Sequence, residues 1–239
     1  MKNMKKAVII LFLSLMHASI TLAQDAKGWS LIPKAGLTNG HWVGDAVAYE
    51  SNRMGWTIGV DAEERVSRLF SMTYGLQYTR TGSIDKINTS RFGGENFPYM
   101  TSINKERKML DYIQLPILAN LHLAKGLTLK AGVQFGFLTR AKLKQHVKGF
   151  FDPYDNNIGT NYTNNNNGTR REFDEDQTSG ILSEFNKVDL CFPVGLSYEF
   201  KNIVLDARYH FGVANIKRIN SCNTYNRYLS VTLGYKFDL

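Results

Sequence analysis

The sequence predicts an all-β fold: an eight-stranded antiparallel transmembrane β-barrel with short periplasmic turns and long extracellular loops. Three observations lead to this prediction. Apolar and polar residues alternate at period two along eight segments, glycine recurs on the polar face of these segments, and short and long connections alternate between them. Alternation at period two is typical of strands with one apolar face, and the other two observations indicate what that face contacts.

The N-terminal segment predicts a secretory signal peptide at residues 1–23, followed by one barrel domain at residues 24–239. Three lysines precede an apolar run from Ala7 to Met16, and small residues lead to Ala23. This run is short for a membrane helix, and no later apolar run is long enough. Any membrane span must therefore be built from strands, so we expect a multi-pass protein of the bacterial outer membrane.

The net charge and the cysteine content exclude few classes of function. The formal net charge of +8 falls to about +5 once the three signal lysines are removed. A modest basic balance spread along an exported chain gives no indication of nucleic-acid binding, and it is compatible with a surface that faces anionic lipid. Cys191 and Cys222 do not make a disulfide framework. We expect two free thiols, with a disulfide between them as the alternative.

The first four strands are expected at residues 30–38, 55–64, 69–81 and 110–123. In the third, apolar side chains occupy every even position from Phe70 to Tyr78. In the fourth, they occupy every odd position from Ile113 to Leu123. The segments are near the roughly 9–11 residues that a tilted strand needs to cross a bilayer.

The last four strands are expected at residues 127–139, 187–200, 203–214 and 227–239. The fifth has apolar residues at odd positions from Leu127 to Phe137, and the sixth has them at even positions from Val188 to Phe200. The eighth repeats the pattern from Leu229 to the last residue of the sequence.

Two short connections predict the pairing of their flanking strands. Residues 201–202 form a two-residue hairpin loop, and residues 124–126 form a three-residue loop that ends in glycine. The predicted opposite pairs are Phe200–Ile203, Ser197–Asp206, Gly195–Arg208, Pro193–His210, His122–Thr128 and Asn120–Lys130. In each hairpin the polar faces of both strands coincide, which a register one residue out would not allow.

A soluble sandwich or barrel also has one apolar face, and three features favour the membrane. Glycine on the polar face suits the crowded concave wall of a small barrel. The apolar faces are bulky and almost free of ionisable residues. The connections after the second, fourth and sixth strands are short and the others are long, which is how outer-membrane barrels are organised. The even face of residues 188–200 is therefore expected to meet lipid.

The segment "YIQLPILANLHL" at residues 112–123, after "SMTYGLQYTRTGS" at residues 71–83, resembles the PorT-like family of small outer-membrane β-barrel proteins of Bacteroidetes. The glycine-ended "PKAGLT" adds to this resemblance. A typical member has an acidic residue where this chain has Gln114. The resemblance implies an outer-membrane barrel and, for the namesake, a part in type IX secretion of cargo to the cell surface. The resemblance assigns no catalytic residue to this chain.

The inward face of the predicted barrel holds a set of charged and titratable residues. Because eight strands enclose an interior just wide enough for side chains, the set is interpreted as a lumenal polar network of mixed sign that fills the lumen. A path for protons or small solutes is the alternative. The members are Lys34, Asp61, Lys130, Asp189, Asp206, Arg208, His210 and Lys236.

No enzyme is expected. Ser197, Asp206 and His210 are all lumenal, but the predicted register places His210 too far from Ser197 for a hydrogen bond. The Asn-rich stretch at residues 140–186 is read as a solvated loop, and Asp174–Asp176 lacks the spacing of a calcium loop. We therefore expect no cofactor, metal or catalytic residue.

The leading functional hypothesis is a structural or assembly component of the outer membrane, linked to protein secretion by the resemblance. Its expected partners are outer-membrane lipid and other envelope or secretion-machine proteins, with no nucleic acid. The alternative from another class is a surface adhesion or binding protein that acts through its long extracellular loops. An outer-membrane lipid hydrolase ranks third.

Overall fold

The computed structural model describes residues 28–45, 50–94, 97–152, 171–218 and 223–239. No helix in this part of the chain is long and apolar enough to cross a membrane. The elements in chain order are β1 (Gly28–Gly44), β2 (Glu50–Arg65), β3 (Phe70–Gly94), β4 (Phe97–Ala124), β5 (Leu127–Asp152), β6 (Arg171–Gly180), η1 (Leu182–Glu184), β7 (Val188–Phe200), β8 (Ile203–Gly212), β9 (Thr224–Tyr235) and β10 (Phe237–Asp238).

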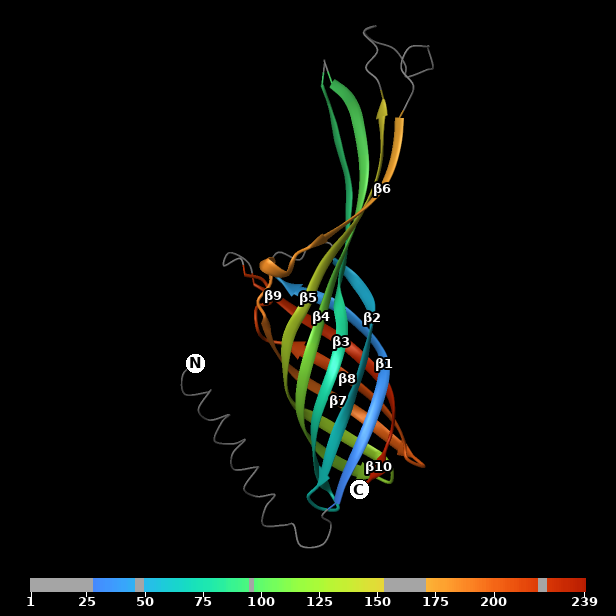
Figure 1. The fold of residues 1–239 in the computed structure, drawn as a ribbon, viewed down its shortest axis with the longest axis vertical. Helices are drawn as coiled ribbons and strands as arrows, with labels where there is room; N and C mark the ends of the chain where they lie inside the picture. The colour runs from blue at the N-terminus through green and yellow to red at the C-terminus, as the bar shows by residue number, and fades with distance from the viewer. Residues whose placement is uncertain (1–27, 46–49, 95–96, 153–170, 219–222) are drawn as a thin grey trace.

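Eight of the strands close into one antiparallel barrel, as predicted. They pair in the order β1-β2-β3-β4-β5-β7-β8-β9, and β9 pairs back with β1 to complete the ring (Figure 1). β10 follows β9 after Lys236 and pairs with the start of β1. Closure leaves the barrel without a free sheet edge, which a spanning sheet requires because hydrocarbon offers no hydrogen-bond partners.

The short turns set the registers that the sequence predicted. Lys201 and Asn202 both have positive φ, at 47° and 68°, as a tight two-residue hairpin loop demands. Gly126 has a φ of 83° in the turn at residues 125–126 between β4 and β5, which is one residue shorter than predicted because Ala124 pairs with Leu127. All six predicted pairs are present, from Phe200 opposite Ile203 to Asn120 opposite Lys130.

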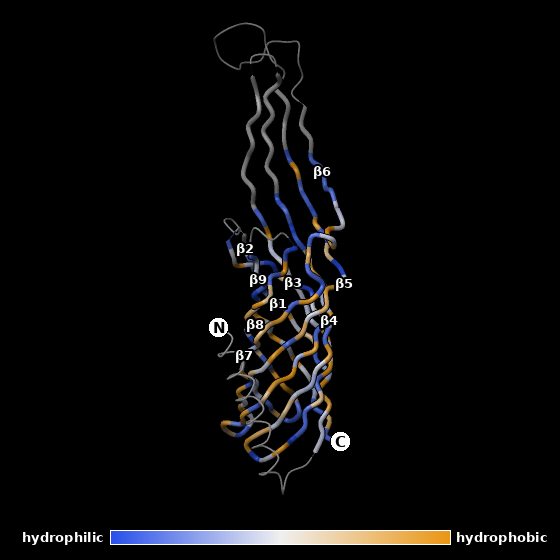
Figure 2. Tube along the Cα trace, turned by 90° about the vertical axis from the view of Figure 1, so that its left-hand side faces the viewer, coloured by the Kyte–Doolittle hydropathy of each residue, from blue (hydrophilic) through white to orange (hydrophobic). Residues whose placement is uncertain are grey.

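The barrel wall is apolar outside and polar inside. Leu196, Leu205 and Leu233 are about half exposed on the outer face, at 49%, 50% and 58%, whereas the neighbouring Ser197 and Asp206 are buried. The alternation is visible along the barrel strands, where apolar and polar residues follow one another (Figure 2). The outer face can be buried only by lipid, so this wall is the membrane-spanning surface.

A four-stranded sheet rises from one side of the barrel (Figure 1). β3, β4 and β5 continue past the level at which β2 stops pairing with β3, and β6 adds to β5 between Lys142 and Phe151. We call residues 86–94, 97–109, 142–152 and 171–180 the projecting sheet. Its described residues are mainly polar (Figure 2).

The projecting sheet corrects the expectation that residues 140–186 form a solvated loop. Residues 141–152 and 171–180 are strands, and so is most of the connection between the third and fourth predicted strands. Residues 171–180 are mostly polar and show no alternation, whereas residues 141–148 alternate apolar and polar residues, so only the extension of the fifth strand could have been predicted from the sequence. The β3–β4 register of the barrel continues unchanged to Asn88, and the β4–β5 register continues after a one-residue shift between Tyr112 and Asp111.

A hydrophobic cluster fills the inner side of the barrel at the end from which the projecting sheet rises. We call it the cap. Residues of barrel strands β1, β4 and β5 meet residues carried by the segments after β6 and β8, which are joined by a bridge between Phe185 and Lys217. Its members are Trp42, Leu110, Tyr112, Leu138, Ala141, Ile181, Phe185 and Ile216, all 7% exposed or less.

Candidate functional site

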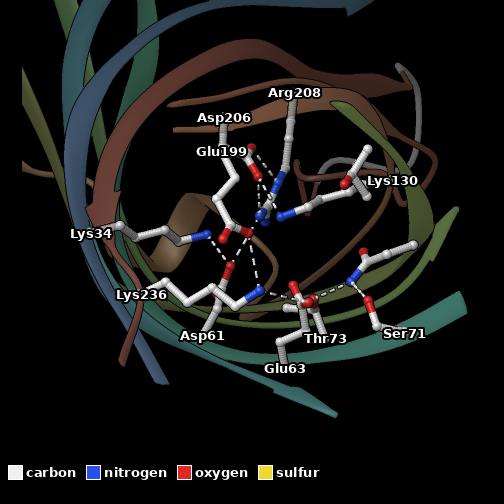
Figure 3. A network of polar contacts seen from close by, with 12 residues as sticks. Lys34, Asp61, Glu63, Ser71, Thr73, Lys130, Glu199, Asp206, Arg208 and Lys236 are labelled. Atoms are coloured by element: carbon white, nitrogen blue, oxygen red, sulfur yellow. Dashed lines mark hydrogen bonds and ion pairs between the residues drawn. The ribbon is translucent and has the colours of Figure 1, made fainter. Parts of the chain in front are cut away.

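Five charged residues from four strands meet in the middle of the barrel (Figure 3). Arg208 Nη2 on β8 donates to Asp206 Oδ2 at 2.7 Å and to Asp61 Oδ2 at 3.0 Å. Lys34 on β1 pairs with Asp61, and Lys130 Nζ on β5 donates to Asp206 Oδ2 at 3.0 Å. All five are 7% exposed or less. Three cations thus surround two carboxylates in this central layer, and each charge has an opposite partner.

The strand sequences make room for this layer with glycine. A Cβ at Gly195 would lie 2.2 Å from the carbonyl oxygen of Ala207 and 2.8 Å from the Arg208 side chain. A Cβ at Gly75 would lie 2.5 Å from Asp61 Oδ1. Alanine at either position would displace the backbone or the ion pairs, so the lumenal glycines are part of the network.

A second layer lies toward the turn end of the barrel. Lys236 Nζ donates to Glu199 Oε2 at 3.1 Å and to Glu63 Oε1 at 3.4 Å. The adjoining hydrogen bonds are uncharged: Asn120 Nδ2 donates to the hydroxyls of Ser71 and Thr73, at 2.9 and 2.7 Å. Figure 3 shows the Lys236 amine reaching toward Glu199 and Glu63 inside the barrel.

A third layer lies between the central charges and the cap. The Tyr228 ring stacks on His210 with centroids 4.0 Å apart, and its hydroxyl accepts hydrogen bonds from Gln114 and Gln134. His210 Nε2 lies 2.9 Å from Ser230 Oγ. These large side chains are almost fully buried, so they occupy the barrel cross-section at this level.

The eight predicted network residues are all buried, and they fall into different groups. Lys34, Asp61, Lys130, Asp206 and Arg208 meet in the central layer, and Lys236 lies in the layer below. His210 and Asp189 bond uncharged groups instead. Asp189 Oδ2 lies 3.6 Å from Cys191 Sγ and 3.5 Å from Asn226 Nδ2, so in the described structure it has no basic partner.

Sequence reasoning missed Glu63, Glu199 and Tyr228. Each stands on the inward side of its strand, so the alternation that identified Asp61 and Asp206 marks these positions as lumenal as well. Their contacts could not be foreseen, because Glu63 and Lys236 lie 173 residues apart and meet only through closure of the barrel.

The hydrolase hypothesis required Ser197, Asp206 and His210 to act together. The structure bonds His210 to Ser230 instead, and Asp206 is held by Lys130 and Arg208. The Ser230–His210 pair was not anticipated. It has no acidic third member, because His210 Nδ1 has no hydrogen-bond partner among the described residues.

The acidic run at residues 174–176 does not converge on a common point. Asp174 and Asp176 lie on one face of β6, where they pair with Lys148 and Lys144, and Glu175 alternates to the other face. Within the described ranges, no group of three or more His, Cys, Asp or Glu residues is arranged to hold a metal ion. Cys191 is buried, and Cys222 lies outside the described residues.

Comparisons with known proteins place these observations in context. A sequence model described as "outer membrane protein beta-barrel domain" matches residues 22–218. No protein of curated function matches the chain.

Among solved structures, Ail of Yersinia pestis with the heparin analogue sucrose octasulfate is 14% identical with a TM-score of 0.39, over 89% of this chain and 100% of that one. Neisserial surface protein A is 15% identical with a TM-score of 0.35, over 89% and 100%. The outer membrane protein AlkL is 15% identical with a TM-score of 0.37, over 91% and 95%.

Proposed function

Since the chain belongs to the family of outer-membrane β-barrel domains, we propose that it is a non-enzymatic binding protein of the cell surface, which contacts its partner through the projecting sheet. In the proposed orientation the projecting sheet lies outside the cell, and the short turns and the C-terminus face the periplasm. The barrel serves as the anchor and contributes no transport path.

The observation that carries this proposal is the projecting sheet itself. β3, β4 and β5 extend it without interruption from the lipid-facing wall, so it is held away from the membrane on paired strands. In the described structure β6 pairs on one side only, with β5. A free strand edge offers a row of backbone donors and acceptors, to which an extended segment of another protein can add as a further strand.

The filled lumen supports contact over transport. Side chains of the central layer, the layer below it and the Tyr228 layer occupy successive levels of the barrel, and the cap covers the end that faces outward. A solute crossing this lumen would have to separate buried ion pairs that stabilise one another.

A part in type IX secretion is the second candidate. It is supported by the resemblance of the fourth barrel strand at residues 112–118 to PorT-like proteins of Bacteroidetes. The free edge of β6 suits a partner in a secretion assembly as well as a partner on another cell, so cellular assays must separate the two hypotheses.

The test is a barrel without its projecting sheet. The observed register allows Asp85 to be joined to Glu106, and Lys144 to Thr178, each through an Asn-Gly turn, because these residues already face one another. We expect the trimmed protein to show the same heat-dependent gel migration as the parent, with loss of cell adherence to surfaces coated with matrix proteins or glycans and with normal secretion. Cargo retained in the periplasm with adherence intact would favour the secretion hypothesis and overturn the binding proposal.

A further inference from the structure

Three arginines gather on the outer wall where β3, β4 and β5 leave the apolar belt. Arg80 holds Asp111 with two hydrogen bonds, from Nε at 2.7 Å and from Nη2 at 2.9 Å. Arg140 approaches the same carboxylate at 4.0 Å. Arg107 follows on the same face of β4. We call Arg80, Arg107 and Arg140 the arginine cluster.

The strand registers place this cluster on the lipid-facing side. β4 points Ile113 and Asp111 outward, and the same alternation carries Arg107 to that face. Asp111 lies opposite Arg140, and Arg107 lies opposite Lys144. The outer face therefore changes from apolar to basic between Tyr78 and Arg80 on β3 and between Phe137 and Arg140 on β5, and it becomes basic on β4 at Arg107.

The cluster keeps an excess of positive charge. The cluster has three arginines beside one carboxylate, Asp111, and that carboxylate already has both oxygens bonded to Arg80. Asp174 and Asp176, the acids of β6 on this face, are paired with Lys148 and Lys144 further up the sheet. The side chain of Arg140 is 56% exposed and Arg107 is exposed, so both can reach a ligand outside the protein.

Aromatic residues mark the level at which the cluster stands. The rings of Trp56 and Tyr78 lie 5.4 Å apart on the outer face directly below it, and the Arg80 guanidinium lies 5.4 Å from the Trp56 centroid. Tryptophan and tyrosine prefer the boundary between hydrocarbon and headgroups. The arginine cluster therefore stands at headgroup height, at the end of the barrel that carries the projecting sheet.

From this geometry we infer that the arginine cluster is a binding site for the phosphate-bearing headgroup of an outer-leaflet lipid. Guanidinium groups bind phosphate oxygens in pairs, and the apolar wall below accommodates the acyl chains of the same molecule. The outer-leaflet assignment rests on the proposed orientation. The binding itself does not, because detergent-purified protein presents the same wall.

The experiment measures retention of a phosphorylated lipid by the full chain. Native mass spectrometry of the purified barrel, mixed with a phosphate-bearing glycolipid and an equal amount of its dephosphorylated form, gives the ratio of the two bound species. At about 1 kcal/mol for each basic residue near a charged lipid surface, the double variant R107Q/R140Q should bind the phosphorylated lipid roughly thirty-fold more weakly. Arg80 is left in place because its loss would strip Asp111 of its partner.

The matched control is K105Q/K148Q, which removes two charges from the same face further from the aromatic belt than Arg107. We expect it to bind like the parent, and all three proteins should show the heat-dependent migration of a folded barrel. An equal loss in the control, or no preference of the parent for the phosphorylated lipid, would overturn the inference. Displacement of the lipid by millimolar inorganic phosphate would assign the cluster to free anions and overturn it as well.

Discussion

Arg208 links the two carboxylates of the central layer, and it therefore governs the stability of the barrel interior. Its Nη2 atom bonds both Asp61 and Asp206, while Lys34 and Lys130 each reach only one of them. A buried ion pair is weak evidence of net stabilisation, because both charges lose their hydration. Removing one partner of such a pair is costly, however, because the other charge then stays buried without compensation.

We predict that R208M lowers the free energy of unfolding of the refolded barrel by about 3–5 kcal/mol, because it leaves two buried carboxylates with one lysine each. Urea unfolding in detergent micelles, followed by tryptophan fluorescence, measures this change. R218M is the control. Arg218 is exposed and its guanidinium donates to the carbonyl oxygen of Ser183, so its loss should change stability by no more than about 0.5 kcal/mol. Equal stability of R208M and the parent would contradict the role of Arg208.

For individual residues, the sequence predicted which side chains point into the lumen, but it did not predict which of them contact one another. Alternation places Asp61 and Arg208 inside, and the tight turn at residues 201–202 pairs Ser197 with Asp206. The bond between Arg208 and Asp61 joins β8 to β2, two strands that are not neighbours in the barrel. Such contacts depend on barrel closure and side-chain reach, for which strand periodicity carries no information.

Among the elements, β6 is the one that local pattern did not reveal, and ion pairs add to its backbone pairing with β5. On one face, Asp176 pairs with Lys144 and His146, and Asp174 pairs with Lys148. The His146 and Lys144 hydrogen bonds hold the pKa of Asp176 below its ordinary value of 3.8. These groups are exposed, so each pair contributes little alone.

The sign of the pH dependence follows from this lowered pKa. The ionised Asp176 favours the attached strand at every pH above its unfolded pKa, and this contribution is lost as the pH falls below about 4 toward its folded pKa. We predict that amide protection factors in β6 fall between pH 5 and pH 3, while those of β7 stay constant. Hydrogen exchange corrected for intrinsic rates measures both strands. D176N should lower the protection factors of β6 at pH 5 and reduce their change between pH 5 and pH 3. If D176N shows the same pH dependence as the parent, groups other than Asp176 cause that dependence.

For the whole molecule, the structure places two barriers in series along the barrel axis. The cap is apolar and is held by segments after β6 and β8, whereas the layers beneath it are polar and are held by barrel strands. Either barrier alone blocks the lumen, so opening it requires changes in both.

We therefore predict no stable conductance in planar bilayers for the parent, for the cap variant F185S/I216S, or for the central-layer variant R208M. The combination of all three substitutions should give discrete conductance steps, because water can then enter through the disrupted cap and reach the unpaired charges of the central layer. Steps from the parent protein would contradict the filled lumen. Steps from the cap variant alone would show that the ion pairs do not form a barrier.

The unbroken passage of β3, β4 and β5 from barrel to projecting sheet also has a mechanical meaning. A pull at the far end of the sheet acts along the strands, and the hydrogen bonds between them run across that direction. A pull along the strands therefore loads many of these hydrogen bonds together in shear, and it does not break them one after another. The sheet is therefore built as a stiff tether, which transmits tension from a contact outside the cell directly into the wall embedded in the membrane.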